Sequence, residues 1–200
     1  MRTPRLSAAE KWEVDALLRE YHYIGTQCAD PTHILVWRGP GGLFGDYGQP
    51  ICAALFAPPA SSAWGVRAIE LIRLVRDEPF VFTLSRFLAE CISWLKATRK
   101  WEVVLAYADP SAGHHGGVYQ AANFFHLGTS SPKAVYLHPN GRRLSMRAFD
   151  QSRLKGRSEW TRIRTSRKFI YAYALTRQSR RTFGARAMPY PKPQALKGRP

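Results

Sequence analysis

The feature that most constrains this fold is an apolar run that stops abruptly at a polar, glycine-rich loop. Residues 101–106 read Trp-Glu-Val-Val-Leu-Ala, which is the pattern of a buried β-strand. The stretch 107–117 holds one acid, two histidines, three glycines and a proline, and a short helix is expected at 118–125. α/β proteins present reactive side chains on such loops at strand ends. We therefore predict an α/β protein whose functional loop contains Asp109.

The rest of the chain alternates between segments with strand and helix patterns. Strands are expected at 33–37, 50–57, 64–75, 134–138 and 168–175, and helices at 84–96 and from about 176 to 187. A capping box of Ser7 and Glu10 predicts a further helix through about Glu20. A hairpin followed by strand–helix–strand–helix order matches an N-acetyltransferase-like mixed sheet flanked by helices. The segment 139–167 is expected to be irregular.

An acid and a base interrupt the apolar strand expected at 64–75. Glu70 and Arg73 are an odd number of positions apart, so a regular strand would place them on opposite faces. Burying an unpaired acid is costly, and Glu70 is therefore expected to have a partner or a function. His22 and Tyr23, after the first predicted helix, also have two interpretations: they belong to a functional site, or they only fill the core.

Positive charge is concentrated in the final part of the chain. Residues 1–130 hold 12 basic and 12 acidic residues, whereas residues 131–200 hold 18 basic and two acidic ones, which accounts for the net charge of +16. Such asymmetry is typical of polyanion binding, and arginines interleaved with aromatic rings suit phosphate contact and stacking. The alternatives are a merely basic tail and a membrane-surface segment. We divide the chain into a catalytic core, 1–130, and a basic DNA-binding extension that completes the sheet, 131–200.

The basic residues of this extension are the candidates for contact with the phosphates of double-stranded DNA. They are Arg142, Arg143, Arg147, Arg164, Arg167, Lys168, Arg180 and Arg181. Each phosphate contact should add about 0.9 to the slope of log affinity against log salt.

Nothing in the sequence directs the chain to a membrane or out of the cell. No apolar run approaches the roughly 18 residues of a bilayer span, and the N-terminus lacks the apolar stretch of a signal peptide. Cys28, Cys52 and Cys91 have no CxxC spacing, and the last two lie in apolar segments. We expect Cys52 and Cys91 to be buried free thiols in a reducing cytoplasm.

Several common catalytic motifs are missing from the chain. It contains no GxSxG, HExxH, CxxC, GxGxxG or Walker A pattern, and no glycine-rich S-adenosylmethionine loop precedes Tyr107-Ala-Asp-Pro. The pyrophosphate signature of acetyltransferases is also absent between the strand ending near 76 and the helix starting at Leu84. What remains is a set of polar groups at the ends of elements: His22, Tyr23, Glu70, Arg73, Ser85, Asp109 and Tyr119.

Each of these groups has a catalytic and a structural interpretation. Asp109 could act as a base or a metal ligand, and Tyr119 could donate a hydrogen bond or act as an acid. Ser85 and Arg86, at the start of the helix expected at 84–96, could bind an anionic cofactor group. Alternatively, Thr83 or Ser85 simply caps that helix. His114 and His115 are adjacent, so their side chains diverge, and we expect them to be loop residues and not ligands.

Several short motifs occur in a fixed order along the chain. They are His22-Tyr23, Glu70-Leu-Ile-Arg-Leu, Thr83-Leu-Ser-Arg-Phe-Leu, Tyr107-Ala-Asp-Pro and Gly117-Val-Tyr-Gln-Ala-Ala-Asn-Phe. In this order the sequence resembles the phage Mom family over most of residues 20–192. Those are DNA-modifying proteins with an N-acetyltransferase-like fold.

The resemblance implies an enzyme that converts adenine in DNA to an N6-carbamoylmethyl derivative and so shields phage DNA from host restriction. By motif match it makes His22, Tyr23, Glu70, Arg73, Ser85, Asp109 and Tyr119 the site candidates. Acetyl-CoA and iron have both been discussed for the family. The missing pyrophosphate signature argues against ordinary acetyl-CoA use, and His22, Glu70 and Asp109 would be suitable ligands for iron(II). The target base would have to be flipped out or met in single-stranded DNA.

Two other functions stay open at this point. One is a non-enzymatic nucleic-acid-binding protein on a degenerate acetyltransferase scaffold, which the missing signature favours. The other is a conventional acetyl-CoA N-acetyltransferase for a protein or small amine, which the basic extension disfavours. The group donor, the DNA sequence context and the oligomeric state are not determined by the sequence.

Overall fold

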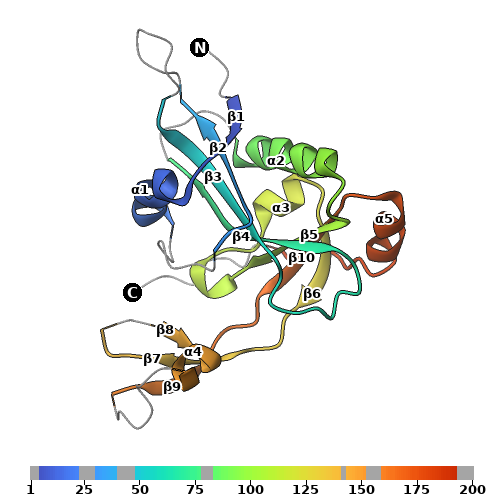
Figure 1. Cartoon of the computed structure of the whole chain (residues 1–200). Helices are drawn as coiled ribbons and strands as arrows, with labels where there is room; N and C mark the ends of the chain where they lie inside the picture. The colour runs from blue at the N-terminus through green and yellow to red at the C-terminus, as the bar shows by residue number, and fades with distance from the viewer. Residues whose placement is uncertain are drawn as a thin grey trace.

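A seven-stranded mixed sheet organises the molecule (Figure 1). The computed structural model describes residues 5–22, 30–39, 48–77, 83–140, 143–151 and 159–192. In spatial order the strands are β1 (Arg5–Ala8), β2 (His33–Arg38), β3 (Pro50–Ala57), β4 (Ala68–Arg76), β5 (Val103–Ala108), β10 (Phe169–Ala174) and β6 (Phe125–Thr129). Neighbouring strands are antiparallel except β4 and β5, which are parallel. The predicted α/β fold with a mixed sheet flanked by helices is confirmed.

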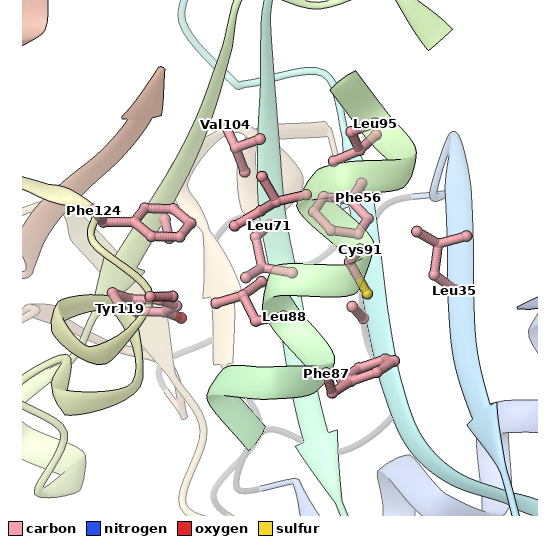
Figure 2. Packing of buried hydrophobic residues seen from close by; sticks show 14 of the residues in the cluster. Leu35, Phe56, Leu71, Phe87, Leu88, Cys91, Leu95, Val104, Tyr119 and Phe124 are labelled. Carbon is pink, nitrogen blue, oxygen red and sulfur yellow. The ribbon is translucent and has the colours of Figure 1, made fainter. Parts of the chain in front are cut away.

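Helices cover both faces of this sheet. On one face lie α2 (Leu84–Thr98) and the short α3 (Gly117–Ala121). The apolar side of α2, which includes Phe87, Leu88 and Leu95, packs on β3, β4 and β5, as Figure 2 shows. The opposite face is covered by α1 (Lys11–Tyr21) over β2 and β3 and by α5 (Arg177–Gly184) beside β10 and β6. The sheet is therefore buried between two helical layers.

A second, three-stranded sheet is inserted between β6 and β10 and projects away from the main sheet (Figure 1). Its strands are β7 (Ala134–Leu137), β8 (Arg143–Ser145) and β9 (Thr161–Arg164), with α4 (Met146–Gln151) alongside. Tyr136 stacks on Phe149 with ring centroids 3.7 Å apart, and Trp160 packs against Phe149 at 5.7 Å. The segment predicted to be irregular, 139–167, thus contains β8, α4 and β9, and that prediction is wrong. We call this inserted unit the small sheet.

Two linkers, residues 130–133 and 165–168, connect the small sheet to the main one. They run beside each other, because the amide of Thr165 donates to the carbonyl of Lys133 at 2.8 Å and the amide of Ser130 donates to the carbonyl of Lys168 at 2.8 Å. Residues 131–200 therefore supply both the small sheet and β10, which lies inside the main sheet between β5 and β6.

A β-bulge at Ile72 changes the direction of one predicted site residue. The register between β3 and β4 shifts at this residue, so that Glu70 lies opposite Ala57 and Arg73 lies opposite Leu55. Because Ala57 and Leu55 are two positions apart on β3, Glu70 and Arg73 point to the same face of the sheet, the one covered by α1. The prediction that they lie on opposite faces is wrong for this reason.

Other local predictions differ in their boundaries. Ser7 lies in β1 opposite Val36, and α1 begins later with a capping box between Glu10 and Glu13, so the predicted Ser7 cap is wrong. The helix expected at 118–125 ends at Ala121, and the chain enters β6 at residue 125. Cys52 and Cys91 are buried and free, as predicted, whereas Cys28 lies outside the described residues. Within the described ranges no helix is long and apolar enough to cross a membrane.

Candidate functional site

β4 and β5 pair over only part of their length, and a cavity opens where the pairing ends. Their parallel ladder runs from Ala68 and Val103 to Leu71 and Ala106. Beyond it lies a cavity of about 570 Å³, lined by residues 71–74 of β4, by residues 107–109 and 112–119, and by Tyr21, His22 and Leu84. We call it the splay cavity. It contains the end of β5 and the glycine-rich loop from which the sequence analysis began.

Four of the predicted site residues line this cavity together: His22, Arg73, Asp109 and Tyr119. They come from four separate parts of the chain, namely the end of α1, the bulged half of β4, the loop after β5 and α3. Tyr23 lies outside the described residues. Among the described residues, Ser85 and Arg86 do not line this cavity or the second one described below.

Asp109 is held on several sides. Its Oδ1 accepts hydrogen bonds from the amide of Ser111 at 3.0 Å, the hydroxyl of Ser111 at 2.6 Å and the hydroxyl of Ser166 at 2.7 Å. Lys168 Nζ lies 3.8 Å from its Oδ2. Burial acts to raise the pKa of this carboxyl, but the hydrogen bonds from Ser111 and Ser166, together with the charge of Lys168, outweigh it and lower the pKa. Asp109 is therefore an oriented carboxylate, tied to the linker at 165–168.

His22 is the residue that ends α1, and its amide donates to the carbonyl of Leu18 at 3.1 Å. Burial lowers the pKa of its imidazole to about 4, and the nearby charges of Arg73 and His114 act in the same direction. At neutral pH the ring is uncharged, so one nitrogen can accept a proton or a hydrogen bond. The imidazole is thus a neutral acceptor next to a fixed guanidinium.

Tyr119 and the loop before it are organised by Tyr171 of β10. The Tyr171 hydroxyl donates to the carbonyl of His115 at 2.6 Å, and Gln120 Nε2 donates to that hydroxyl at 3.1 Å. The rings of Tyr119 and Tyr171 pack with centroids 5.3 Å apart. A side chain at Gly116, where φ is +85°, would come within 2.3 Å of the Tyr171 ring. Sequence reasoning missed both Tyr171 and Gly116, because no local pattern connects residues so far apart.

A second cavity, of about 500 Å³, lies beside the first. It is formed by the turn at 60–64, Glu70, Tyr107, Ile170, Arg186 and the two linkers. We call it the linker cavity. Tyr107 lines both cavities, whereas Glu70 lines only this one. Burial raises the pKa of the Glu70 carboxyl, while the charges of Lys133 and Lys168 and a hydrogen bond from the Ala60 amide oppose the shift.

The predicted iron ligands do not come together. Glu70 opens into the linker cavity, whereas His22 lines the splay cavity and Asp109 is bound by Ser111, Ser166 and Lys168. In the parts of the chain that the structure describes, no three His, Cys, Asp or Glu side chains are placed to hold a metal ion. The described residues therefore do not fit the proposed iron site.

The side chains of the predicted anion site, at the start of α2, contact other side chains of the protein. Arg86 Nε lies 3.8 Å from the Glu90 carboxylate, and its guanidinium lies over the ring of Trp37, 5.9 Å from the centroid. The Ser85 hydroxyl donates to the Thr83 hydroxyl at 3.3 Å. Thr83 occupies the N-cap position without a side-chain capping bond.

The described members of the predicted DNA-binding set lie in the small sheet, on the linker after β9 and on α5. Arg164, Arg167 and Lys168 lie at the end of β9 and on the linker next to it, and both arginines are exposed. Arg180 and Arg181 are exposed on α5, which lies apart from the small sheet in Figure 1. Arg143 begins β8 and Arg147 lies in α4, while Arg142 is outside the described residues.

Comparison with known proteins gives both a family and a fold. A family model described as the Mom protein family matches residues 4–192. Among curated proteins, no significant match to the chain was found. Among solved structures, the ribosomal-protein-S18-alanine N-acetyltransferase from Escherichia coli has a TM-score of 0.53 at 10% identity, covering 87% of this chain and 95% of that one.

Two further solved structures are similar to this chain to the same degree. An N-acetyltransferase from Staphylococcus aureus Mu50 has a TM-score of 0.51 at 16% identity, covering 88% of this chain and 100% of that one. A GNAT-like decarboxylase, GphF, in complex with isobutyryl-CoA has a TM-score of 0.53 at 13% identity, covering 86% and 100%. At these identities the likeness shows the fold, which is that of the N-acetyltransferases.

Proposed function

The chain belongs to the Mom protein family, and from that premise we propose that it is a transferase that modifies adenine in DNA. The proposed product is the N6-carbamoylmethyl derivative of the base. The observation that carries the proposal is the splay cavity, where His22, Arg73, Asp109 and Tyr119 meet from four separate parts of the chain. Polar groups that converge in one cavity from distant segments are typical of an active site.

The splay cavity is the proposed site of the group donor. Its volume of about 570 Å³ lies within the range of cavities that hold small-molecule cofactors. A structurally similar decarboxylase is in complex with isobutyryl-CoA, which favours a thioester of the coenzyme A type as the donor here. Such a thioester would position the transferred group, but it activates its own carbonyl carbon and not the methylene carbon that becomes joined to N6. Arg73, fixed by a hydrogen bond from its Nη1 to the carbonyl of Ile72 at 2.7 Å, would orient an oxygen of that donor.

The chain's own groups have distinct proposed roles at the acceptor. Adenine N6 is a weak nucleophile because its lone pair is delocalised into the ring, so loss of its proton must accompany bond formation. In the transfer one N–H bond of the amine breaks, one N–C bond forms, and the leaving group departs from the donor. Asp109, whose carboxylate is tied to the linker at 165–168, is the proposed acceptor of the amine proton, and the neutral His22 imidazole is proposed to accept a hydrogen bond in the splay cavity.

Simple acetyl transfer would give a different product. It would place an acetyl group on N6, whereas the carbamoylmethyl group is joined to N6 through a methylene carbon. The donor must therefore carry an additional activation that these side chains do not define. We derive no step through iron, because the described residues do not fit an iron site.

Analysis of nucleosides tests the proposal directly. DNA from cells that express the chain is digested to nucleosides and compared by mass spectrometry with DNA from cells that carry an empty vector. We expect a heavier deoxyadenosine only in the first sample. Unmodified DNA in the presence of folded protein would contradict the proposal and favour the nucleic-acid-binding alternative, for which the missing pyrophosphate signature between β4 and α2 is the specific observation.

A further inference from the structure

We propose that the linker cavity is the binding site for the acceptor nucleotide, with the adenine amine directed at Glu70 and the phosphates held by Lys133, Lys168 and Arg186. The inference rests on the proposed function and adds where the substrate lies. The splay cavity would then hold only the donor, so that the two reactants occupy separate cavities that meet at Tyr107.

The size and position of the linker cavity fit an extruded nucleotide. Its volume of about 500 Å³ is within the range that encloses small ligands. It lies on the face of the sheet opposite α2, where Glu70 and Tyr107 point away from the α2 core. Figure 1 shows the connection from β3 to β4 passing the same end of the sheet as the linkers to the small sheet. A base that leaves the duplex beside the small sheet would enter here.

The charges that line the cavity match a nucleotide. Glu70 is the one acid among its described lining residues, and Lys133, Lys168 and Arg186 are the cations. Three cations suit phosphate groups, and a carboxyl group can accept a hydrogen bond from an exocyclic amine. Burial raises the pKa of Glu70, and the charges of Lys133 and Lys168 oppose that shift.

Aromatic surface is present where a base would stack. Trp64 is half-buried, and its ring packs against Phe183 of α5 with centroids 6.4 Å apart. A hydrogen bond joins its side chain to that of Tyr107, so the two residues form one continuous wall. An extruded base loses its stacking in the duplex, and contact with this wall would replace that loss.

The linker cavity also adjoins the Asp109 carboxylate, which the proposed reaction uses. Ser166 and Lys168 line it, and the same two residues hold the carboxylate of Asp109. Glu70 and Arg73 point to one face of the sheet because of the bulge at Ile72. Because Tyr107 lines both cavities, an amine placed at Glu70 would lie next to the splay cavity, with Tyr107 between them.

Binding of a mononucleotide tests the site without any donor. The full chain is titrated with 2′-deoxyadenosine 5′-monophosphate by calorimetry, alongside Glu70→Leu, Glu70→Gln and the charge-matched control Asp30→Asn, whose side chain is 99% exposed. We expect Glu70→Leu to weaken binding by about tenfold or more. Glu70→Gln should stay within about threefold of the unchanged protein, because its amide oxygen keeps an acceptor for the exocyclic amine. Equal binding by Glu70→Leu and Asp30→Asn would overturn the inference.

The cations are tested in the same assay. Lys133→Ala should weaken the binding of the mononucleotide by about tenfold, whereas Lys96→Ala, on α2 at the other face of the sheet, should leave it unchanged. An equal loss in both variants would mean that only net charge matters and would overturn the proposed phosphate contact.

Photocrosslinking separates this inference from the proposed function and needs no variant. The unchanged protein is irradiated with a DNA oligonucleotide that carries 8-azidoadenine, and the modified peptide is identified by mass spectrometry. Attachment at Trp64 supports the inference, whether or not modified nucleosides are found in cells. Attachment at His114 or Tyr119, which line only the splay cavity, overturns it even where the heavier deoxyadenosine is present.

Discussion

The splay cavity and the linker cavity are built from the same two strands but differ in what lines them. The splay cavity opens where β4 and β5 stop pairing, and its walls carry His22, Arg73, Tyr119 and the glycine-rich loop. The linker cavity lies beside the paired part of these strands, and half of its lining residues come from the predicted extension, 131–200. The first is thus formed by a break in the sheet, and the second by an insertion placed against the sheet.

In the proposed function, this difference between the cavities would keep the donor and the acceptor nucleotide apart. A break in a sheet leaves a narrow passage between strands, which suits one elongated donor. A hollow rimmed by cations on one face is accessible to a nucleotide that remains joined to a DNA chain. Asp109 and Tyr107 lie at the boundary, so substitutions there should affect both cavities, whereas substitutions further away should affect only one.

The largest effect is expected at that boundary. Asp109→Ala removes a carboxylate held by Ser111, Ser166 and Lys168, and we expect the yield of modified deoxyadenosine to fall by at least about 100-fold. The affinity for duplex DNA should stay within about twofold, measured by fluorescence anisotropy. Asp109→Asn is the matched control, which keeps the shape but loses the charge. Full product yield from Asp109→Ala would remove the carboxylate from the mechanism.

A pair of glycines in the splay cavity gives the next largest effect. Gly116 and Gly113 both have positive φ, but a Cβ at Gly116 would lie 2.3 Å from the Tyr171 ring, whereas nothing lies within 4 Å at Gly113. We expect Gly116→Ala to lower the free energy of unfolding by about 3 kcal/mol, from backbone strain and overpacking together. Gly113→Ala should cost about 1 kcal/mol, from strain alone. Urea unfolding measures both, and equal losses would contradict the predicted contact with Tyr171.

The exposed arginines at the end of β9, on the linker after it and on α5 should affect DNA binding without affecting the fold. The double variants Arg164→Ala/Arg167→Ala and Arg180→Ala/Arg181→Ala each remove two exposed arginines. For each pair we expect the slope of log affinity against log salt to fall by about 2, with roughly tenfold weaker binding near physiological salt. If only one double variant lowers the slope, the duplex contacts only the surface that carries that pair of arginines. A slope that neither pair lowers would exclude both surfaces as phosphate contacts.

The smallest effect concerns pH and belongs to the splay cavity alone. The pKa of His22 is about 4 in the folded chain, below the ordinary value of 6.5 that applies after unfolding. The unfolded state therefore gains a proton first as the pH falls, so the contribution of His22 to stability is complete above pH 6.5 and is lost toward pH 4. We expect a loss of about 1 kcal/mol between pH 7 and 5, reduced by the partial exposure of the ring.

The control for this prediction is a variant that cannot titrate. His22→Gln should flatten the dependence of the unfolding free energy on pH over the same interval, measured by urea unfolding at each pH. An identical slope in both proteins would mean that His22 has the same pKa when folded and unfolded.

Local sequence patterns determined much of the fold and the position of one candidate site residue. Apolar periodicity placed β3, β5, β10 and α2 close to their observed bounds, because these segments are buried along one face or both. The break in the pattern after Ala106 located Asp109 at the end of a buried strand. The uneven distribution of charge along the chain was also clear from the sequence, since the count of basic residues does not depend on folding.

Tertiary structure alone decided which of the candidate groups meet. The bulge at Ile72 turned Arg73 to the face of Glu70, and strict strand alternation could not predict it. The insertion of β10 between β5 and β6 brought Tyr171 against Gly116, 55 positions earlier in the sequence. The linkers at 130–133 and 165–168 formed a cavity with Glu70 that separates it from His22. Periodicity reports only whether a residue faces the core, whereas strand order and register, which depend on pairing between distant segments, decide what it faces there.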